Sequence, residues 1–141
     1  MEAISSSILA LDVGAKRIGI AIASSVSRLP RPYKTLENND HFLPALKGIV
    51  ESEGVDTLVV GLPRNLSGQS TDQTTYVQTF TAKLYKELPL AISFQDEALT
   101  SKKAEEELES RGKPYQRGDI DALAATYILE DFLAEHKEGV A

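Results

Sequence analysis

An apolar run that ends in an acid and is followed at once by a second apolar run constrains the fold most. Residues 8–11 (Ile-Leu-Ala-Leu) have the composition of a central strand buried on both faces, and Asp12 follows them directly. A second apolar run covers residues 18–23 after a short turn at residues 13–16. So short a connection allows only an antiparallel pair of strands. The sequence therefore predicts a hairpin whose first strand carries a carboxylate in the middle of a sheet.

The remaining elements follow from the spacing of apolar residues and from turn signals. An edge strand is expected at residues 33–36, and a helix with period-3.6 spacing begins after Asp40 and ends at Gly54. The later expected elements are a strand at 57–61, a helix at 71–87, a strand at 91–94 and helices at 100–111 and 119–136. This order predicts an α/β fold with a mixed five-stranded sheet and helices on both faces. We expect a single domain over residues 1–141.

Composition excludes several classes of site. The chain has no cysteine, so a disulfide framework, a thiolate zinc site and a cysteine nucleophile are excluded. Two histidines leave little room for a histidine-built metal site or a serine protease triad. No apolar run approaches the roughly 18 residues of a membrane span, and residues 1–7 lack the features of a signal peptide. We therefore expect a cytoplasmic protein with no membrane partner.

Charge is distributed unevenly along the chain. The formal net charge of −6 argues mildly against a nucleic-acid partner. Residues 1–36, however, contain five basic against two acidic side chains, a net charge of +3. A local basic surface of this kind can bind phosphates while the rest of the protein stays acidic. Ordinary solubility explains the same pattern equally well.

Two acids occupy positions near strand ends where a carboxylate is costly. Asp12 ends a buried strand, and burying an ionised carboxylate without a partner costs roughly several kcal/mol. A metal or another partner is therefore expected there, unless Asp12 only caps the turn at Gly14. Glu97 follows the last strand, where open sheets carry their sites. Because side chains alternate along a strand, only one of Asp96 and Glu97 can face a given cleft. A solvated acid before a helix is the alternative for each.

A third acid begins the apolar stripe of the last helix. Asp121 shares one helical face with Ala125, Ile128 and Phe132, and this face is expected to pack on the sheet. Asp119 lies on another face and suits the N-cap position. The alternative role for Asp121 is a favourable charge near a helix N-terminus.

Asp12, Glu97 and Asp121 could converge on one spot. Carboxylates without histidine or cysteine suit Mg²⁺ or Mn²⁺. Two such ions can activate a water molecule and stabilise the leaving oxygen of a phosphodiester.

Basic side chains near these acids are candidates for contacts with a nucleic acid. Lys16 and Arg17 lie in the hairpin turn, and Arg64 lies in the loop after a central strand. All three could contact a phosphate backbone, and solvated turn or loop positions are the alternative. Lys113 and Arg117 border the last helix, where a solvated loop is favoured over a role in tracking a strand.

Two glycines and two aromatic residues have simpler expected roles. Gly14 is expected to supply a positive φ in the turn, and Gly19 could allow close approach of a backbone or substrate. Tyr76 and Phe80 are expected in the core rather than on a base-stacking surface.

Four segments resemble, in order, the motifs of one family. They are residues 11–21 (LDVGAKRIGIA), 59–63 (VVGLP) with Gly68, 96–100 (DEALT) and 121–125 (DALAA) with Ile128 and Leu129. Together they resemble the YqgF/RuvX-type pre-16S rRNA nucleases, also called Holliday junction resolvases. The resemblance covers about residues 8–133.

This resemblance implies a ribonuclease H-like fold and a role in trimming the 5′ end of 16S rRNA during ribosome assembly. It also implies that Asp12, Glu97 and Asp121 are the metal-binding catalytic acids, with Mg²⁺ or Mn²⁺ as cofactor. Ala98 stands where the family usually has arginine, which puts the grip on the substrate in doubt but not the metal site.

Several functions remain open at this point. The sequence does not decide between structured RNA and four-way DNA junctions, nor between a monomer and a homodimer, although a symmetric junction favours a dimer. A non-catalytic nucleic-acid or ribosome-binding module is an alternative, against which the three acids in apolar settings argue. An ATP-binding protein of the actin, chaperone and sugar-kinase type needs a second lobe, for which 141 residues leave no room.

Overall fold

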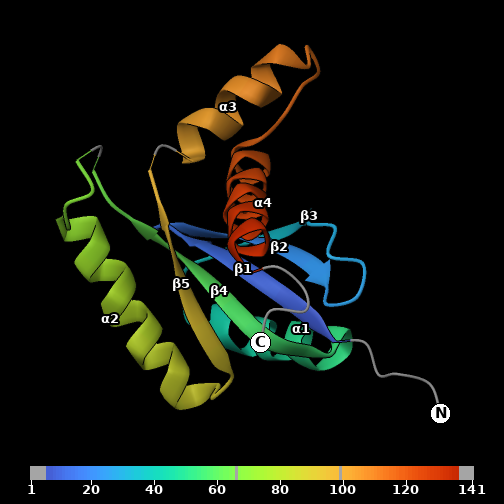
Figure 1. Ribbon diagram of the computed structural model, residues 1–141, viewed down its shortest axis with the longest axis vertical. Coiled ribbons are helices and arrows are strands. Elements are labelled where there is room, and N and C mark those ends of the chain that lie inside the picture. Colours follow the sequence, from blue (N-terminus) through green and yellow to red (C-terminus); the bar gives the residue numbers. More distant parts are fainter. Residues whose placement is uncertain (1–5, 66, 99, 137–141) are drawn as a thin grey trace.

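One mixed sheet organises the computed structural model, which describes residues 6–65, 67–98 and 100–136. The strands of the described residues lie in the order β3-β2-β1-β4-β5 (Figure 1). Their bounds are β1 Ser7–Val13, β2 Arg17–Ser24, β3 Arg31–Glu37, β4 Val55–Pro63 and β5 Ala91–Glu97. β1 pairs antiparallel with β2 and parallel with β4, while β4 pairs parallel with β5. The predicted hairpin, edge strand and mixed five-stranded sheet are confirmed.

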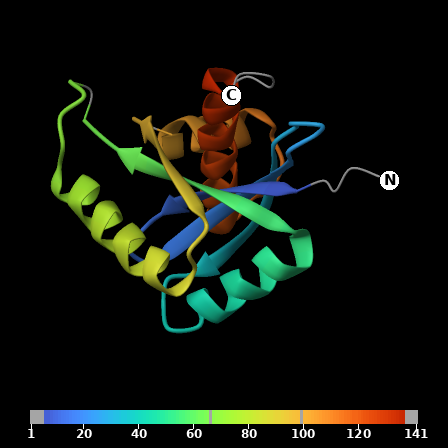
Figure 2. The same cartoon turned by 60° about the horizontal axis from the view of Figure 1, so that its bottom comes forward.

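Helices α1 and α2 cover one face of this sheet (Figure 2). Helix α1 spans Phe42–Glu53 and ends at Gly54, whose φ of 63° only glycine adopts readily. Helix α2 spans Asp72–Glu87 and begins at a capping box between Thr71 and Thr74. The core on this face contains large aliphatic side chains from all the central strands, among them Leu9, Leu11, Ile18, Ile20, Leu58 and Val60.

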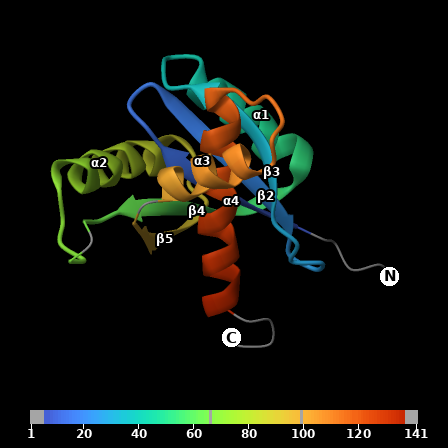
Figure 3. The same ribbon diagram turned by 90° about the horizontal axis from the view of Figure 1, so that it is seen from above.

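Helix α4 covers the opposite face, and helix α3 packs on α4 (Figures 1 and 3). Helix α3 spans Thr100–Ser110 and α4 spans Arg117–Glu135. The apolar stripe predicted for the last helix faces the sheet, where it packs against small strand residues. This core contains Ala10, Ala21, Ala23, Val59, Ala125, Ile128, Leu129 and Phe132. Helices therefore lie on both faces, as predicted.

Two strand glycines allow α4 to lie directly on the sheet. A Cβ atom on Gly19 of β2 would lie 2.0 Å from the carbonyl oxygen of Asp121. A Cβ atom on Gly61 of β4 would lie 2.4 Å from Cδ1 of Ile128. Since real Cβ contacts are essentially never so short, a side chain at Gly19 would have to displace the backbone of α4, whereas one at Gly61 would have to displace the end of the Ile128 side chain. Gly19 therefore admits the backbone of α4, as the sequence suggested.

The start of α4 differs from the prediction. The helix begins at Arg117, two residues before the expected start. The Asp119 carboxylate accepts a hydrogen bond from the backbone N–H of Gln116 at 2.9 Å, so Asp119 lies inside the first turn and is not the N-cap residue. The first turn of α4 also contacts the sheet, because the Thr35 hydroxyl of β3 donates a hydrogen bond to the Gly118 carbonyl at 2.6 Å.

Two smaller expectations are wrong. Gly14 is not among the described glycines with positive φ; it is needed because a Cβ atom would lie 2.8 Å from the Arg17 carbonyl oxygen. Tyr76 is 39% exposed, and its hydroxyl accepts a hydrogen bond from Asn38, whereas Phe80 packs against the core. No helix in the described ranges is both long and apolar enough to cross a membrane.

Candidate active site

One cavity on the α4 face is lined by all three predicted acids. Asp12 comes from β1, Glu97 from the end of β5 and Asp121 from α4, and the cavity volume is about 350 Å³. Strand alternation explains why they share a face. Ile8 and Ala10, which have the same parity as Asp12, contact α4. The cavity, which we call the acid cavity, is also lined by Gly14, Gly61, Arg64, Gln73, Ala98 and Lys102.

Asp12 is the acid whose charge is least compensated. Burial, followed by the negative charge of Asp121, raises the pKa of Asp12 from 3.8 to about 7. Among the described residues, no lysine or arginine forms an ion pair with it. An acid whose pKa is raised to near neutral pH by burial and by a like charge is typical of functional sites.

Asp121, by contrast, has a cation as partner. The Arg17 Nε atom donates to Oδ2 of Asp121 at 2.7 Å, and the Asp121 side chain is only 16% exposed. This ion pair joins the start of β2 to α4 and orients the Asp121 carboxylate. Arg17, expected to contact phosphates, thus has at least one nitrogen engaged with an acid of the site.

Glu97 has one carboxylate oxygen that is buried without a hydrogen-bond partner. Burial raises the pKa of Glu97 to about 9; hydrogen bonding with Asp131 and its charge add to this effect, as does Glu135, while Lys103 opposes it. The Glu97 side chain therefore lies toward two acids of α4 that our sequence analysis missed. Their signal was present: Asp131 and Glu135 follow Asp121 by about three and four helical turns and return to nearby sides of the helix.

The donor set fits a hard divalent cation, although the side chains do not form a coordination shell. Clustered carboxylate oxygens, one of them buried and unpaired, are the chemistry that Mg²⁺ and Mn²⁺ prefer. In the described part of the chain, no three potential ligands lie close enough together to hold one ion. The structure brings Asp12, Glu97 and Asp121 to one cavity, with Asp12 beside Asp121 and Glu97 turned toward Asp131.

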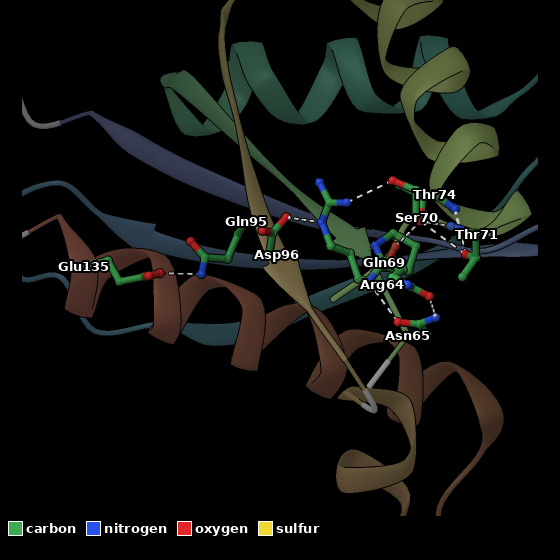
Figure 4. A network of polar contacts seen from close by, with 10 residues as sticks. Arg64, Asn65, Gln69, Ser70, Thr71, Thr74, Gln95, Asp96 and Glu135 are labelled. Carbon is green, nitrogen blue, oxygen red and sulfur yellow. Dashed lines mark hydrogen bonds and ion pairs between the residues drawn. The ribbon is translucent and has the colours of Figure 1, made fainter. Parts of the chain in front are cut away.

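Arg64 and Asp96 pair on the other side of β5 (Figure 4). The Arg64 Nε atom donates to Asp96 at 3.0 Å, and its Nη1 atom donates to the Ser70 hydroxyl at 3.0 Å. Gln95, one residue earlier, points the opposite way and donates to Glu135 of α4. The expected alternation is confirmed, because Asp96 and Glu97 face opposite sides.

Of the three basic residues predicted to contact phosphates, Arg64 lines the acid cavity, whereas Lys16 and Arg17 are not among its lining residues. Lys16 is exposed in the hairpin turn next to Arg17. Ala98 lines the cavity without a charge, and Lys102 of α3, which sequence reasoning did not single out, lines the same wall. A lysine four residues after Ala98 in the sequence was the available signal.

Sequence comparison identifies a family and close relatives. The family model described as "RuvX: Holliday junction resolvase" matches residues 6–135. A protein of Maridesulfovibrio salexigens, described as "Putative pre-16S rRNA nuclease", is 37% identical over 131 residues, covering 90% of this chain and 97% of the relative. A protein of Crocosphaera subtropica with the same description is 38% identical over 141 residues, covering 97% of each chain.

Solved structures of low sequence identity share the fold. One is described as "T. thermophilus RuvC in complex with Holliday junction substrate" and has a TM-score of 0.54 at 13% identity, with 92% of this chain and 96% of that chain covered. A second Thermus thermophilus RuvC structure has a TM-score of 0.52 at the same identity and coverage. The ribonuclease H-like fold implied by the sequence motifs is confirmed.

Proposed function

This chain belongs to the RuvX family, and we propose that it is a nuclease that hydrolyses phosphodiester bonds at the acid cavity. The observation that carries the proposal is the meeting of Asp12, Glu97 and Asp121, from three separate elements, at one cavity with one carboxylate oxygen buried and unpaired. Such an arrangement destabilises the fold unless a cation compensates it. It is therefore better explained by a reaction site than by packing.

The three acids would hold Mg²⁺ or Mn²⁺, which supplies an activated water and stabilises the leaving oxygen. Asp12 and Asp121 line the same cavity, where the charge of Asp121 raises the pKa of Asp12, and the partnerless oxygen of Glu97 supplies a further donor. Arg17 keeps the Asp121 carboxylate oriented through its hydrogen bond. Lys16, Arg17 and Arg64 bind phosphates of the substrate on either side of the cavity.

Pre-16S rRNA is the substrate we favour, with processing of its 5′ end during ribosome biogenesis in the cytoplasm. Its support is the description shared by relatives that match this chain over 90% or more of its length. The description of the family and the fold shared with RuvC support a four-way DNA junction as the second candidate. Trimming one RNA end needs one protomer, whereas a symmetric junction favours a homodimer.

The test is a cleavage assay on three matched substrates: 16S RNA with a 5′ extension, linear duplex DNA and a four-way junction. We expect the wild type to cleave the RNA with Mg²⁺ or Mn²⁺ and not with EDTA. Asp12→Asn should lower the rate at least about a hundredfold, since it removes one ligand of the charge-stabilising site. Asp56→Asn, at an exposed acid at the opposite end of the sheet, is the matched control. Equal rates for Asp12→Asn and wild type would contradict the catalytic assignment.

Metal binding can be measured without any substrate. Because a ligand that binds only the folded state raises its stability, Mn²⁺ should raise the melting temperature of the wild type. This increase should be absent in Asp12→Asn and in Asp121→Asn and retained in Asp56→Asn. A non-catalytic module of the same fold would show no increase in any of the four proteins.

A further inference from the structure

A second cavity opens beside the acid cavity, between α3 and the start of α4. Its volume is about 540 Å³, and it shares Ser101 and Asp121 with the acid cavity. The two cavities are therefore adjacent. We call this second cavity the flanking cavity; its polar lining residues are Arg17, Ser101, Glu105, Tyr115, Arg117 and Asp121.

Cations line the α4 side of the flanking cavity. Arg17 is already bound to Asp121, which places its guanidinium at the boundary between the two cavities. Arg117 is exposed, and no ion pair involving it is found among the described residues. It is also the first residue of α4, where the helix dipole disfavours a positive charge. Arg117 therefore does not stabilise α4 through the helix dipole, and its guanidinium is available to bind an anionic ligand.

The flanking cavity also has an apolar part. Tyr115 and Ile120 both line the flanking cavity and pack against the core between α3 and α4. The Tyr115 hydroxyl donates to Glu109 at 2.8 Å, which holds the ring in place. Glu105 on α3 carries the opposite charge and repels phosphates from its own side. This charge distribution favours a phosphate near Arg17 and Arg117 and an uncharged part of the same ligand near Tyr115.

We propose that the flanking cavity binds one unpaired nucleotide of the substrate, next to the bond that is cut. Its phosphate lies on Arg17 and Arg117, and its base lies against Tyr115. Only an unpaired base exposes its flat face to an aromatic side chain, so the segment bound here is single-stranded. The inference rests on the proposed function in one respect: Asp121, shared by both cavities, belongs to the cleavage site.

Binding to a labelled single-stranded RNA tests the flanking cavity separately from cleavage. The probe is a fluorescent oligonucleotide of about 12 nucleotides, a length within the site sizes of such proteins. Fluorescence anisotropy is measured with Mg²⁺ in the Asp12→Asn background, which leaves the probe uncut, at several salt concentrations. Arg117→Ala is compared with Arg31→Ala, an exposed arginine at the far end of β3. Tyr115→Leu is compared with Tyr115→Phe, which loses only the hydrogen bond to Glu109.

We expect Arg117→Ala to weaken binding about fivefold and to reduce the slope of log K against log salt by about 0.7, the loss of one single-strand phosphate contact. Tyr115→Leu should weaken binding about tenfold with the slope unchanged, because base stacking is not electrostatic. Arg31→Ala should bind like the parent protein, and Tyr115→Phe, which keeps the aromatic ring, should lose less affinity than Tyr115→Leu. Circular dichroism melts confirm that each variant is folded.

Two results overturn the inference and leave the proposed function intact. One is parental affinity and salt slope in both Arg117→Ala and Tyr115→Leu. The other is failure of the parent to bind the single strand although the wild type cleaves a structured substrate. A wild type that cleaves none of the three substrates with any divalent metal overturns the proposed function instead, whatever the oligonucleotide does.

Discussion

The two faces of the sheet carry different kinds of side chain, although the same strands form both. Toward α1 and α2, strand β1 presents Leu9 and Leu11, both fully buried in a core of large aliphatic side chains. Toward α4, it presents Ala10 and then Asp12, and the helix comes close because the opposing residues are small. Adjacent residues of one strand thus serve stability on one face and chemistry on the other.

The difference shows how a carboxylate cluster can be kept in a small protein. On the α4 face, alanine and glycine bring the helix backbone near the sheet, so Asp121 meets Asp12 where charge is costly. Among the described residues, the buried core on the other face contains no acid, and its hydrophobic burial offsets the cost of the carboxylates on the α4 face. Each prediction below perturbs one face and measures whether the other responds.

The largest expected effect concerns the pH dependence at Asp12. Its pKa is raised from 3.8 in the unfolded chain to about 7 in the fold, so its contribution to stability is fully present below pH 4 and is lost as the pH rises through 7. In EDTA, Asp12→Asn should therefore gain stability relative to the wild type between pH 5 and 8, by up to about 4 kcal/mol. Urea unfolding at several pH values measures this; a difference that does not change with pH would contradict it.

The next effect belongs to the opposite face. Leu11→Ala should lower the free energy of unfolding by about 3 kcal/mol, because it leaves a void in a fully packed core. The cleavage rate per folded molecule should stay close to that of the wild type, since Leu11 faces away from the acid cavity. Loss of cleavage by a Leu11→Ala variant that remains stably folded would contradict the separation of stability and catalysis between the two faces.

Gly19→Ala should lower both the stability of the fold and the function of the acid cavity, which the preceding substitution affects separately. The added Cβ would overlap the Asp121 carbonyl, so the start of α4 must move, at a cost of about 2 kcal/mol. Asp121 moves with it, and we expect both the Mn²⁺-induced rise in melting temperature and cleavage to fall. If Gly19→Ala left both unchanged, the close helix–sheet contact would not be what positions Asp121.

The smallest effect is the matched control for that substitution. Gly48 lies within α1, where an added Cβ meets nothing within 4 Å. Gly48→Ala should therefore raise the free energy of unfolding by about 0.5–1 kcal/mol, through helix propensity alone. Cleavage should remain at the wild-type rate, and a loss of stability would show that α1 packs more tightly than described.

Local periodicity explains how much of this arrangement the sequence predicts. The parity of Asp12 within β1 and the helical stripe that Asp121 begins are both short-range patterns, and together they direct two acids to one face. The alternation that separates Asp96 from Glu97 is equally local. These patterns are sufficient to predict the sheet, the helices and the common face of Asp12 and Asp121.

Contacts between distant segments explain what the sequence did not predict. Arg17 and Asp121 pair across 104 positions, and nothing near either residue indicates the partner. Glu97 turns toward Asp131 of α4 because of how the helix crosses the sheet, which periodicity does not specify. The first turn of α4 likewise has a tertiary contact that periodicity does not specify, from the Thr35 hydroxyl to the Gly118 carbonyl.

The place of α4 in the chain has a consequence during protein synthesis. A ribosome delivers α1, α2 and all five strands before α4 emerges, and domains generally fold as units. Until residues 117–135 have left the exit tunnel, Asp121 is absent and the sheet face that bears Asp12 is uncovered. A nascent chain therefore holds no complete acid cavity until α4 has left the exit tunnel of a ribosome, whose own RNA belongs to the class of molecule that the finished protein is proposed to cut.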